Sequence, residues 1–369
     1  MPLALILLYL GSFTGSGQSA EVNAGFERAA ALQRNGALAE AAAEYRKVLA
    51  LAPDYAEAQA NLGAVLSRLG NYEEAIAAYE SALRLNPKLT PILLNLGIAH
   101  YRAGQFAQAV AALERFLAVA PDHLQARQLI GLSLVELGRD AEAVTQLEPT
   151  LSAVPDDVTV LYSLGLAYLR LRRPELASAQ QRLAARADGV ALARLLQGQA
   201  HVELFEFEKA AEELAAAAKL SPDLPRLHFL RGLTYLKLGR PEEARAFLER
   251  ELGRTPNDFL TLYYLASLLE TRGDLSAARQ RIEAALKQEP QSVEAATLLG
   301  SILLKQGQAA DAVRVLEPAV ARQPQHAETR YLLARSYQKL GRRQEAAREF
   351  AEVERLKAQE REKERKPNP

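Results

Sequence analysis

Proline recurs in this chain at a constant interval of 34 residues, and this period restricts the possible folds more than any other feature of the sequence. Every interval has this length except the one from Pro155 to Pro222, which covers two units, one of them lacking its proline and one residue shorter. Periods of roughly 20 to 50 residues indicate solenoids, propellers or arrays of small units. The series is Pro53, Pro87, Pro121, Pro155, Pro222, Pro256, Pro290 and Pro324.

Glycines and alanines repeat in the same register as the prolines. The glycine falls where a first helix would end and suits the left-handed residue that follows many helices, while the proline stops a second helix. Each unit is therefore expected to be a helix–turn–helix. The glycines are Gly36, Gly70, Gly104, Gly138, Gly239, Gly273, Gly307 and Gly341, and the alanines, present in all ten units, are Ala41, Ala75, Ala109, Ala143, Ala177, Ala210, Ala244, Ala278, Ala312 and Ala346.

Small and large residues also fall at fixed places when each unit is numbered so that its proline is position 32. Position 8 is glycine or alanine, position 20 is alanine, and position 24 is mostly a large apolar residue such as Tyr79 or Leu113. Small residues let two helices approach closely, so that the large side chain of one enters a groove of the other. One such hairpin cannot bury both of its faces, and neighbouring units are expected to stack and complete the core.

The second unit shows the complete pattern in Leu62, Gly63, Leu66, Gly70, Tyr72, Ala75, Tyr79, Ala82 and Pro87. This pattern resembles the tetratricopeptide repeat, a helix–turn–helix of about 34 residues. The chain departs from the family in having no tryptophan for position 4. The resemblance implies an all-α fold, a right-handed α-solenoid of about ten repeats. The repeats, numbered one to ten below, are residues 22–55, 56–89, 90–123, 124–157, 158–190, 191–224, 225–258, 259–292, 293–326 and 327–356.

The two ends of the chain differ from the repeats. Residues 1–20 open with an uncharged apolar run followed by small and polar residues, which resembles a secretory signal peptide and is too short to span a bilayer. We therefore predict export to the periplasm or outside the cell. The alternative is an apolar arm that docks on the first repeat of a cytoplasmic protein. Residues 357–369 are mostly charged, and this tail is predicted to extend the last helix into water.

The middle of the array is irregular. Repeat five has Arg172 at the glycine position, Gln181 at the large apolar position and Gly189 at the proline position, and repeat six has Phe205 at the glycine position. We expect either a different turn or backbone strain at Arg172, because an arginine rarely adopts the left-handed conformation. Two interpretations stay open: a joint between repeats five and six, or sequence drift within a continuous stack.

The chain shows no motif for catalysis or metal binding. It has no cysteine, which excludes disulfides and thiolate metal sites. None of its five histidines forms the i, i+4 pair of a helical zinc motif, and neither a phosphate-binding loop nor a nucleophile elbow is present. Lys+Arg and Asp+Glu both number 45, so no overall field that attracts nucleic acid is expected. We predict a non-enzymatic protein with no cofactor, no metal and no integral membrane span.

The resemblance implies that the first helix of each repeat lines a concave groove through positions 2, 5, 9 and 12. In the central repeats these positions are apolar, which predicts an interaction surface unless tight curvature or the leader covers them. Only Arg226 and Arg335 are basic there, which disfavours the Lys/Asn/Arg clamp of chaperone-tail binders. The predicted groove residues are Leu94, Ile98, Tyr101, Leu132, Val135, Tyr162, Leu166, Leu169, Leu192, Leu195, Val202, Phe229, Leu233 and Leu236.

These features together predict a scaffold that binds a protein or peptide, and no nucleic acid. The predicted ligand is an apolar or amphipathic segment held in the groove. One alternative is an envelope-assembly factor that organises a secretion or polysaccharide complex. A second alternative is a cytoplasmic adaptor, if the leader is not cleaved.

Overall fold

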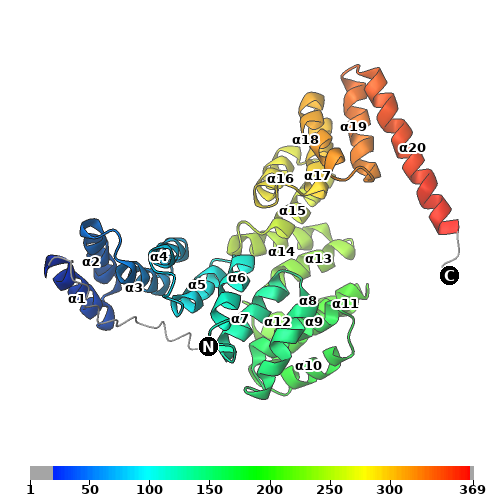
Figure 1. Ribbon diagram of the computed structural model, residues 1–369. Coiled ribbons are helices and arrows are strands. Elements are labelled where there is room, and N and C mark those ends of the chain that lie inside the picture. The colour runs from blue at the N-terminus through cyan, green and yellow to red at the C-terminus, as the bar shows by residue number, and fades with distance from the viewer. Residues whose placement is uncertain (1–19, 366–369) are drawn as a thin grey trace. The chain divides into compact units, whose positions relative to one another are not determined.

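The computed structural model describes residues 20–365, and all of its regular secondary structure in this range is helical. The predicted all-α solenoid is thereby confirmed (Figure 1). The predicted leader, apart from Ala20, and residues 366–369 lie outside the described part of the chain. The chain divides into two compact units, residues 1–196 and 197–369. Their boundary lies inside α11, a few residues beyond the predicted end of repeat five at Val190.

Each repeat contributes a first and a second helix, and each first helix begins within two residues of the predicted start of its repeat. The first helices are α1 Ala20–Arg34, α3 Ala56–Arg68, α5 Ile92–Arg102, α7 Leu124–Glu136, α9 Val158–Arg170, α11 Val190–Glu203, α13 Leu227–Lys237, α15 Phe259–Arg272, α17 Val293–Lys305 and α19 Ala327–Lys339. The second helices are α2 Leu38–Leu51, α4 Tyr72–Leu85, α6 Phe106–Leu117, α8 Asp140–Leu147 with the 3-10 helix η1 Glu148–Ser152, α10 Glu175–Ala184, α12 Phe207–Leu220, α14 Pro241–Arg254, α16 Leu275–Gln288, α18 Ala309–Arg322 and α20 Arg343–Arg365.

The turn between the two helices depends on a residue with positive φ. Gly138 has φ +70°, its N–H donates to the Val135 carbonyl at 3.1 Å, and the Arg139 N–H donates to the Leu134 carbonyl at 2.9 Å. These two bonds form a Schellman motif, which satisfies carbonyls that the helix end leaves unpaired. All eight predicted turn glycines have φ between +69° and +87°, as glycine without a Cβ readily does.

The two helices of a repeat touch through the small residue at position 8 and the large residue at position 24. A Cβ placed on Gly232 would lie 2.7 Å from Cγ of Leu248, and one on Gly63 would lie 2.8 Å from the ring of Tyr79. No real Cβ fits at such distances, so glycine sets how closely the helices approach. The position 20 alanines support the same contact, since Ala75 and its equivalents are fully or almost fully buried except in repeat five.

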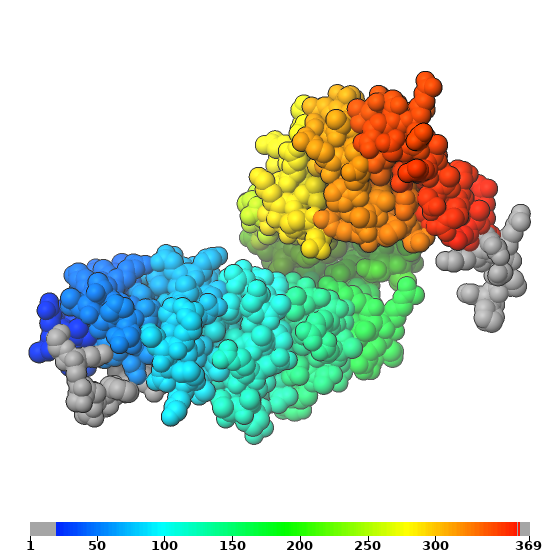
Figure 2. Space-filling model, turned by 45° about the horizontal axis from the view of Figure 1, so that its top comes forward, coloured from blue at the N-terminus to red at the C-terminus, as the bar shows by residue number. Residues whose placement is uncertain are grey.

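Successive repeats pack in one pattern in both compact units. The second helix of one repeat packs on the first helix of the next, as in α4 on α5 and α16 on α17. The first helices also contact one another from repeat to repeat, as α3 does α5 and α17 does α19. The first helices therefore form a continuous face from α1 to α9 and another from α15 to α19. Figure 2 shows residues 20–196, blue to green, as an unbroken series of such repeats.

Repeat five departs from this packing, and the prediction that Ala177 is its small contact residue is wrong. Ala177 is exposed, whereas Ala179 and Leu183, each two residues beyond the expected position, are buried. The cause is Pro174, after which α10 starts late and runs for only ten residues. Because Gln181 does not fill the space beside Gly165, Leu196 of α11 fills it instead.

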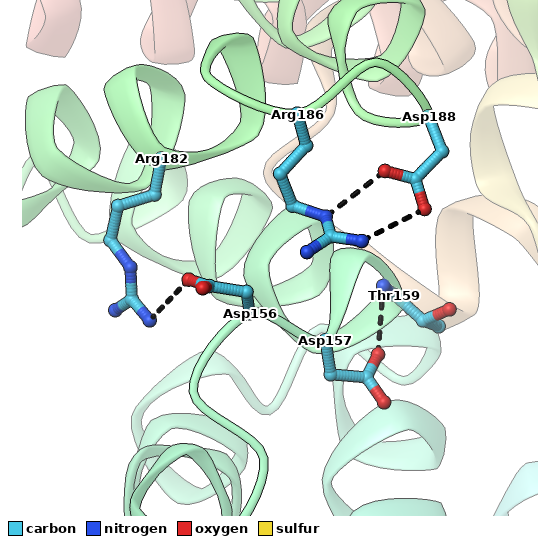
Figure 3. Close-up of polar contacts among 6 residues, drawn as sticks. All are labelled: Asp156, Asp157, Thr159, Arg182, Arg186 and Asp188. Atoms are coloured by element: carbon cyan, nitrogen blue, oxygen red, sulfur yellow. Dashed lines mark hydrogen bonds and ion pairs between the residues drawn. The ribbon is translucent and has the colours of Figure 1, made fainter.

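Polar contacts hold the loops at the two ends of repeat five, the one before α9 and the one after α10 (Figure 3). Arg186 forms a two-point ion pair with Asp188, at 3.0 and 3.2 Å, in the loop that leads to α11. Arg182 contacts Asp156 at 3.4 Å, while Asp157 caps α9 by accepting the Thr159 N–H at 2.9 Å. These loops are thus fixed by side chains where the repeat lacks its proline.

Arg172 and Phe205 keep the turn that glycine makes elsewhere. Their φ angles are +53° and +60°, and the residues after them donate to the Tyr168 and His201 carbonyls at 2.8 and 2.9 Å. The expectation of a different turn at Arg172 is therefore wrong, and the expected strain applies. A left-handed residue other than glycine costs about 1–2 kcal/mol.

Replacing either residue by glycine is expected to stabilise the protein. Arg172→Gly and Phe205→Gly should each raise the free energy of unfolding by roughly 0.5–1 kcal/mol, since relief of strain exceeds the extra flexibility of the unfolded chain. Gly138→Ala is the matched control and should lower it. Urea unfolding followed by circular dichroism provides the measurement, and lower stability of both glycine variants would contradict the strain.

Repeat seven contains two glycines within helices, and we expect their replacement by alanine to change the stability of the protein in opposite directions. Gly232→Ala should cost roughly 1–3 kcal/mol because its new methyl group overlaps Leu248. Gly253 in α14 has no atom near its Cβ direction, so Gly253→Ala should gain up to about 1 kcal/mol of helix propensity. Thermal unfolding of the two variants should therefore shift in opposite directions, and equal shifts would contradict the close-contact role of position 8.

Candidate partner-binding surface

The predicted groove residues all lie on first helices, but the structure separates them into two groups. Five are buried, and their prediction as exposed groove surface is wrong. The exposed fraction is 3% for Leu94 and 0% for Leu195. The buried five are Leu94, Ile98, Val135, Leu195 and Phe229, and the partly exposed nine are Tyr101, Leu132, Tyr162, Leu166, Leu169, Leu192, Val202, Leu233 and Leu236.

Four of the nine partly exposed apolar residues lie together around repeat five. A small core of Leu161, Leu183, Ala193 and Leu196 exists there, distinct from the larger core that extends from repeat one. Tyr162, Leu166, Leu169 and Leu192 pack against this small core and keep part of their surface open. We call these four residues the repeat-five apolar surface.

Phe229 in repeat seven belongs to the core for identifiable reasons. The Arg226 guanidinium lies 4.7 Å from the centre of its ring, and the Tyr264 ring lies 5.9 Å away. Arg226 itself has a left-handed φ of +57° and provides no side-chain cap for α13. Glu251 of α14 replaces that cap, because its carboxylate accepts the Phe229 N–H at 3.1 Å. A carboxylate at a helix N-terminus is stabilising.

Charge on the first helices of repeats eight to ten is separated along the helices. Burial raises the pKa of Tyr263, and Tyr264 with the carboxylates of Glu328 and Glu294 adds to the rise. These two carboxylates occupy position 2, near the start of their helices. The starts of α17 and α19 are therefore acidic.

The ends of the same helices form a basic pocket. A hollow of about 320 Å³ opens between α17 and α19. Sequence reasoning singled out Arg335 but missed Lys305 and Lys339, because position 13 was not counted as part of the groove. The spacing of Arg335 and Lys339, one helical turn apart, was the available signal. The lining residues are Ser301, Leu304, Lys305, Tyr331, Leu332, Arg335 and Lys339.

A second hollow, of about 530 Å³, lies among α4, α5 and α6. Its rim carries Glu80 together with Arg84 and Arg115, so both signs of charge face it. Across residues 20–365, no group of three histidine or carboxylate side chains is placed to hold a metal ion. No helix in that range is long and apolar enough to cross a membrane.

Comparison with known families identifies the class of protein. Tetratricopeptide repeat models match residues 21–88, 62–132, 129–191 and 195–259, which together extend over more than half of the chain. A model described as anaphase-promoting complex, cyclosome, subunit 3 matches residues 256–353. The chain belongs to the tetratricopeptide repeat family. Its fold is a non-enzymatic protein-interaction scaffold.

A solved structure shares this fold. The anaphase-promoting complex hetero-tetramer Cut9–Hcn1 contains a chain that is 14% identical, with 91% of this chain and 87% of that chain covered and a TM-score of 0.53. A structure of MamA is 19% identical over 45% of this chain and 96% of that chain, with a TM-score of 0.42. No curated protein matches the sequence significantly.

Proposed function

We propose that this protein holds an apolar or amphipathic segment of a partner protein against the repeat-five apolar surface. The observation that carries the proposal is that Tyr162, Leu166, Leu169 and Leu192 stay partly open to solvent although they lie beside a core. At the equivalent positions in repeats three and four, Leu94 and Val135 are buried.

The physical basis of this surface is the short second helix of repeat five. Because α10 is displaced by Pro174 and Leu196 is used to fill the space beside Gly165, the hairpin core is small. Fully burying a leucine side chain yields about 1.5–3 kcal/mol, and covering the exposed part of these four partly buried residues contributes a fraction of that for each. An apolar or amphipathic helix or strand supplies the matching surface.

Photo-crosslinking on the native protein tests this proposal. A benzophenone amino acid in place of Leu166 should form a discrete adduct, because Leu166 lies within the surface. Mass spectrometry should then map the adduct to a partner segment with apolar residues on one side. Thr145, exposed on the second helix α8, is the matched control position and should yield no adduct.

A second substitution separates binding from folding. Leu169→Asp should reduce the adduct at position 166 at least tenfold, because a charge would be buried without a partner. Its helicity should match that of the parent protein. Adducts formed only from position 145, or a mapped segment of charged residues alone, would contradict the proposal and favour the envelope-assembly alternative.

The proposal includes export from the cytoplasm. It is supported by the uncharged apolar run at residues 2–10 and the small residues that follow it. Mass spectrometry of the native protein should place its mature N-terminus near residues 15–21. An intact Met1 or Pro2 on protein recovered from the cytoplasm would instead favour the cytoplasmic adaptor.

A further inference from the structure

The basic pocket of repeats nine and ten has a chemistry different from that of the repeat-five apolar surface. We infer that this pocket binds a carboxylate of an acidic partner segment. The inference rests on the proposed function, because it assumes a protein ligand along the first helices. It adds a second contact of opposite character, at residues that the apolar proposal does not use.

The first line of evidence is a pair of cations without anions. Arg335 and Lys339 lie one turn apart on α19, both exposed, and within residues 20–365 neither forms an ion pair. Like charges at this spacing destabilise a helix by a few tenths of a kcal/mol. Nearby arginines differ, since Arg330 pairs with Glu349 and Arg342 with Glu345. The pair in the pocket is thus left open to an external anion.

The floor of the pocket is already neutral and rigid. The Lys305 ammonium lies 2.5 Å from Oε1 of Glu270, and the same oxygen accepts the Ser301 hydroxyl at 2.8 Å. The Glu270 side chain is only 12% exposed, whereas the Lys305 side chain is 48% exposed, so the pair has its carboxylate inside the protein and its ammonium at the surface. Lys305 is therefore satisfied within the protein, and the two cations of α19 are the free donors.

Arg335 is held in position before any ligand arrives. One of its guanidinium nitrogens donates to the Tyr331 hydroxyl at 3.1 Å, and the guanidinium carbon lies 5.9 Å from the centre of the same ring. A guanidinium has five N–H donors, so most remain available for a carboxylate. An arginine with a fixed orientation loses less entropy when it binds.

The residues that line the pocket indicate which kind of residue lies next to the carboxylate in the ligand. Leu304 and Leu332 lie beside the cations, and Tyr331 is 40% exposed. The expected ligand is therefore an aspartate, a glutamate or a chain-terminal carboxylate that follows an apolar residue. This set of residues differs from the Lys/Asn/Arg clamp considered above, because it contains no asparagine and uses positions 9 and 13.

Titration of the full chain with short peptides tests the inference. The probes are Ac-Leu-Glu-Leu-Glu-NH2, its glutamine counterpart, the same peptide with a free terminal carboxylate, and a phosphoserine version. Binding is followed by NMR through the side-chain Nε–H signal of Arg335, which Arg335→Gln identifies. The glutamate peptide should shift this signal saturably, whereas the glutamine peptide should not. Comparison of the amide with the free acid distinguishes side-chain from terminal carboxylates.

Substitutions inside and outside the pocket should change the Kd of the glutamate peptide by different amounts. Arg335→Gln with Lys339→Gln should raise the Kd of the glutamate peptide about tenfold or more, as expected for lost charge-assisted hydrogen bonds; the Tyr331 ring signals then report binding. Arg348→Gln, an exposed arginine on α20 outside the pocket, should leave the Kd unchanged.

Three outcomes would overturn the inference: no shift with any acidic peptide, equal binding of the glutamine peptide, or a preference of more than tenfold for phosphoserine. None of these depends on the repeat-five apolar surface. Crosslinking from position 166 can succeed while the peptide titration fails, or the reverse, so the failure of one proposal is distinguishable from the failure of the other.

Discussion

The contact between a small residue on the first helix, glycine in most repeats and alanine in the others, and a large side chain on the second determines how the regular hairpins of this protein pack. The Cγ of Leu248 occupies space 2.7 Å from where a Cβ of Gly232 would be, and the same contact recurs with Leu214 and Leu316. The helices can approach this closely only because one partner lacks a side chain. Repeat five shows how strict this requirement is. Its second helix offers Gln181 instead of a leucine, and Leu196 from the following helix fills the space beside Gly165.

Much of the fold could be predicted from the period because the turn and the close contact each require a particular residue type. A turn with positive φ favours glycine, and a close approach of two helices requires glycine or alanine. Both requirements are therefore visible in the sequence as residue types at fixed positions. The period alone does not show which residues of a helix face the core when that helix starts late. Ala177 stands in the expected place in the sequence, yet Pro174 delays α10 and turns Ala179 and Leu183 inward. The turn at Phe205 shows the converse, since the backbone keeps the left-handed geometry without glycine.

The candidate site was less predictable than the fold, because exposure depends on neighbouring repeats. Register correctly assigns Leu94, Val135 and Leu166 to first helices, but it cannot show that the adjacent helices cover the first two and leave the third partly open. The basic pocket was missed for a related reason. Lys339 belongs to a position that the family pattern does not assign to the groove, and only the packing of α17 beside α19 brings it to the same hollow as Lys305.

The repeat architecture also determines how the two proposed contacts relate in energy. In a solenoid each repeat packs on its neighbours alone, so stability is approximately a sum of local terms. The apolar surface depends on the displaced helix of repeat five, and the basic pocket depends on Glu270, Lys305 and Tyr331 of repeats eight to ten. A substitution in one group changes no contact of the other. Changes more than about 10 Å apart without shared partners combine additively. Each proposed contact can therefore be weakened by substitution while the other keeps its own strength.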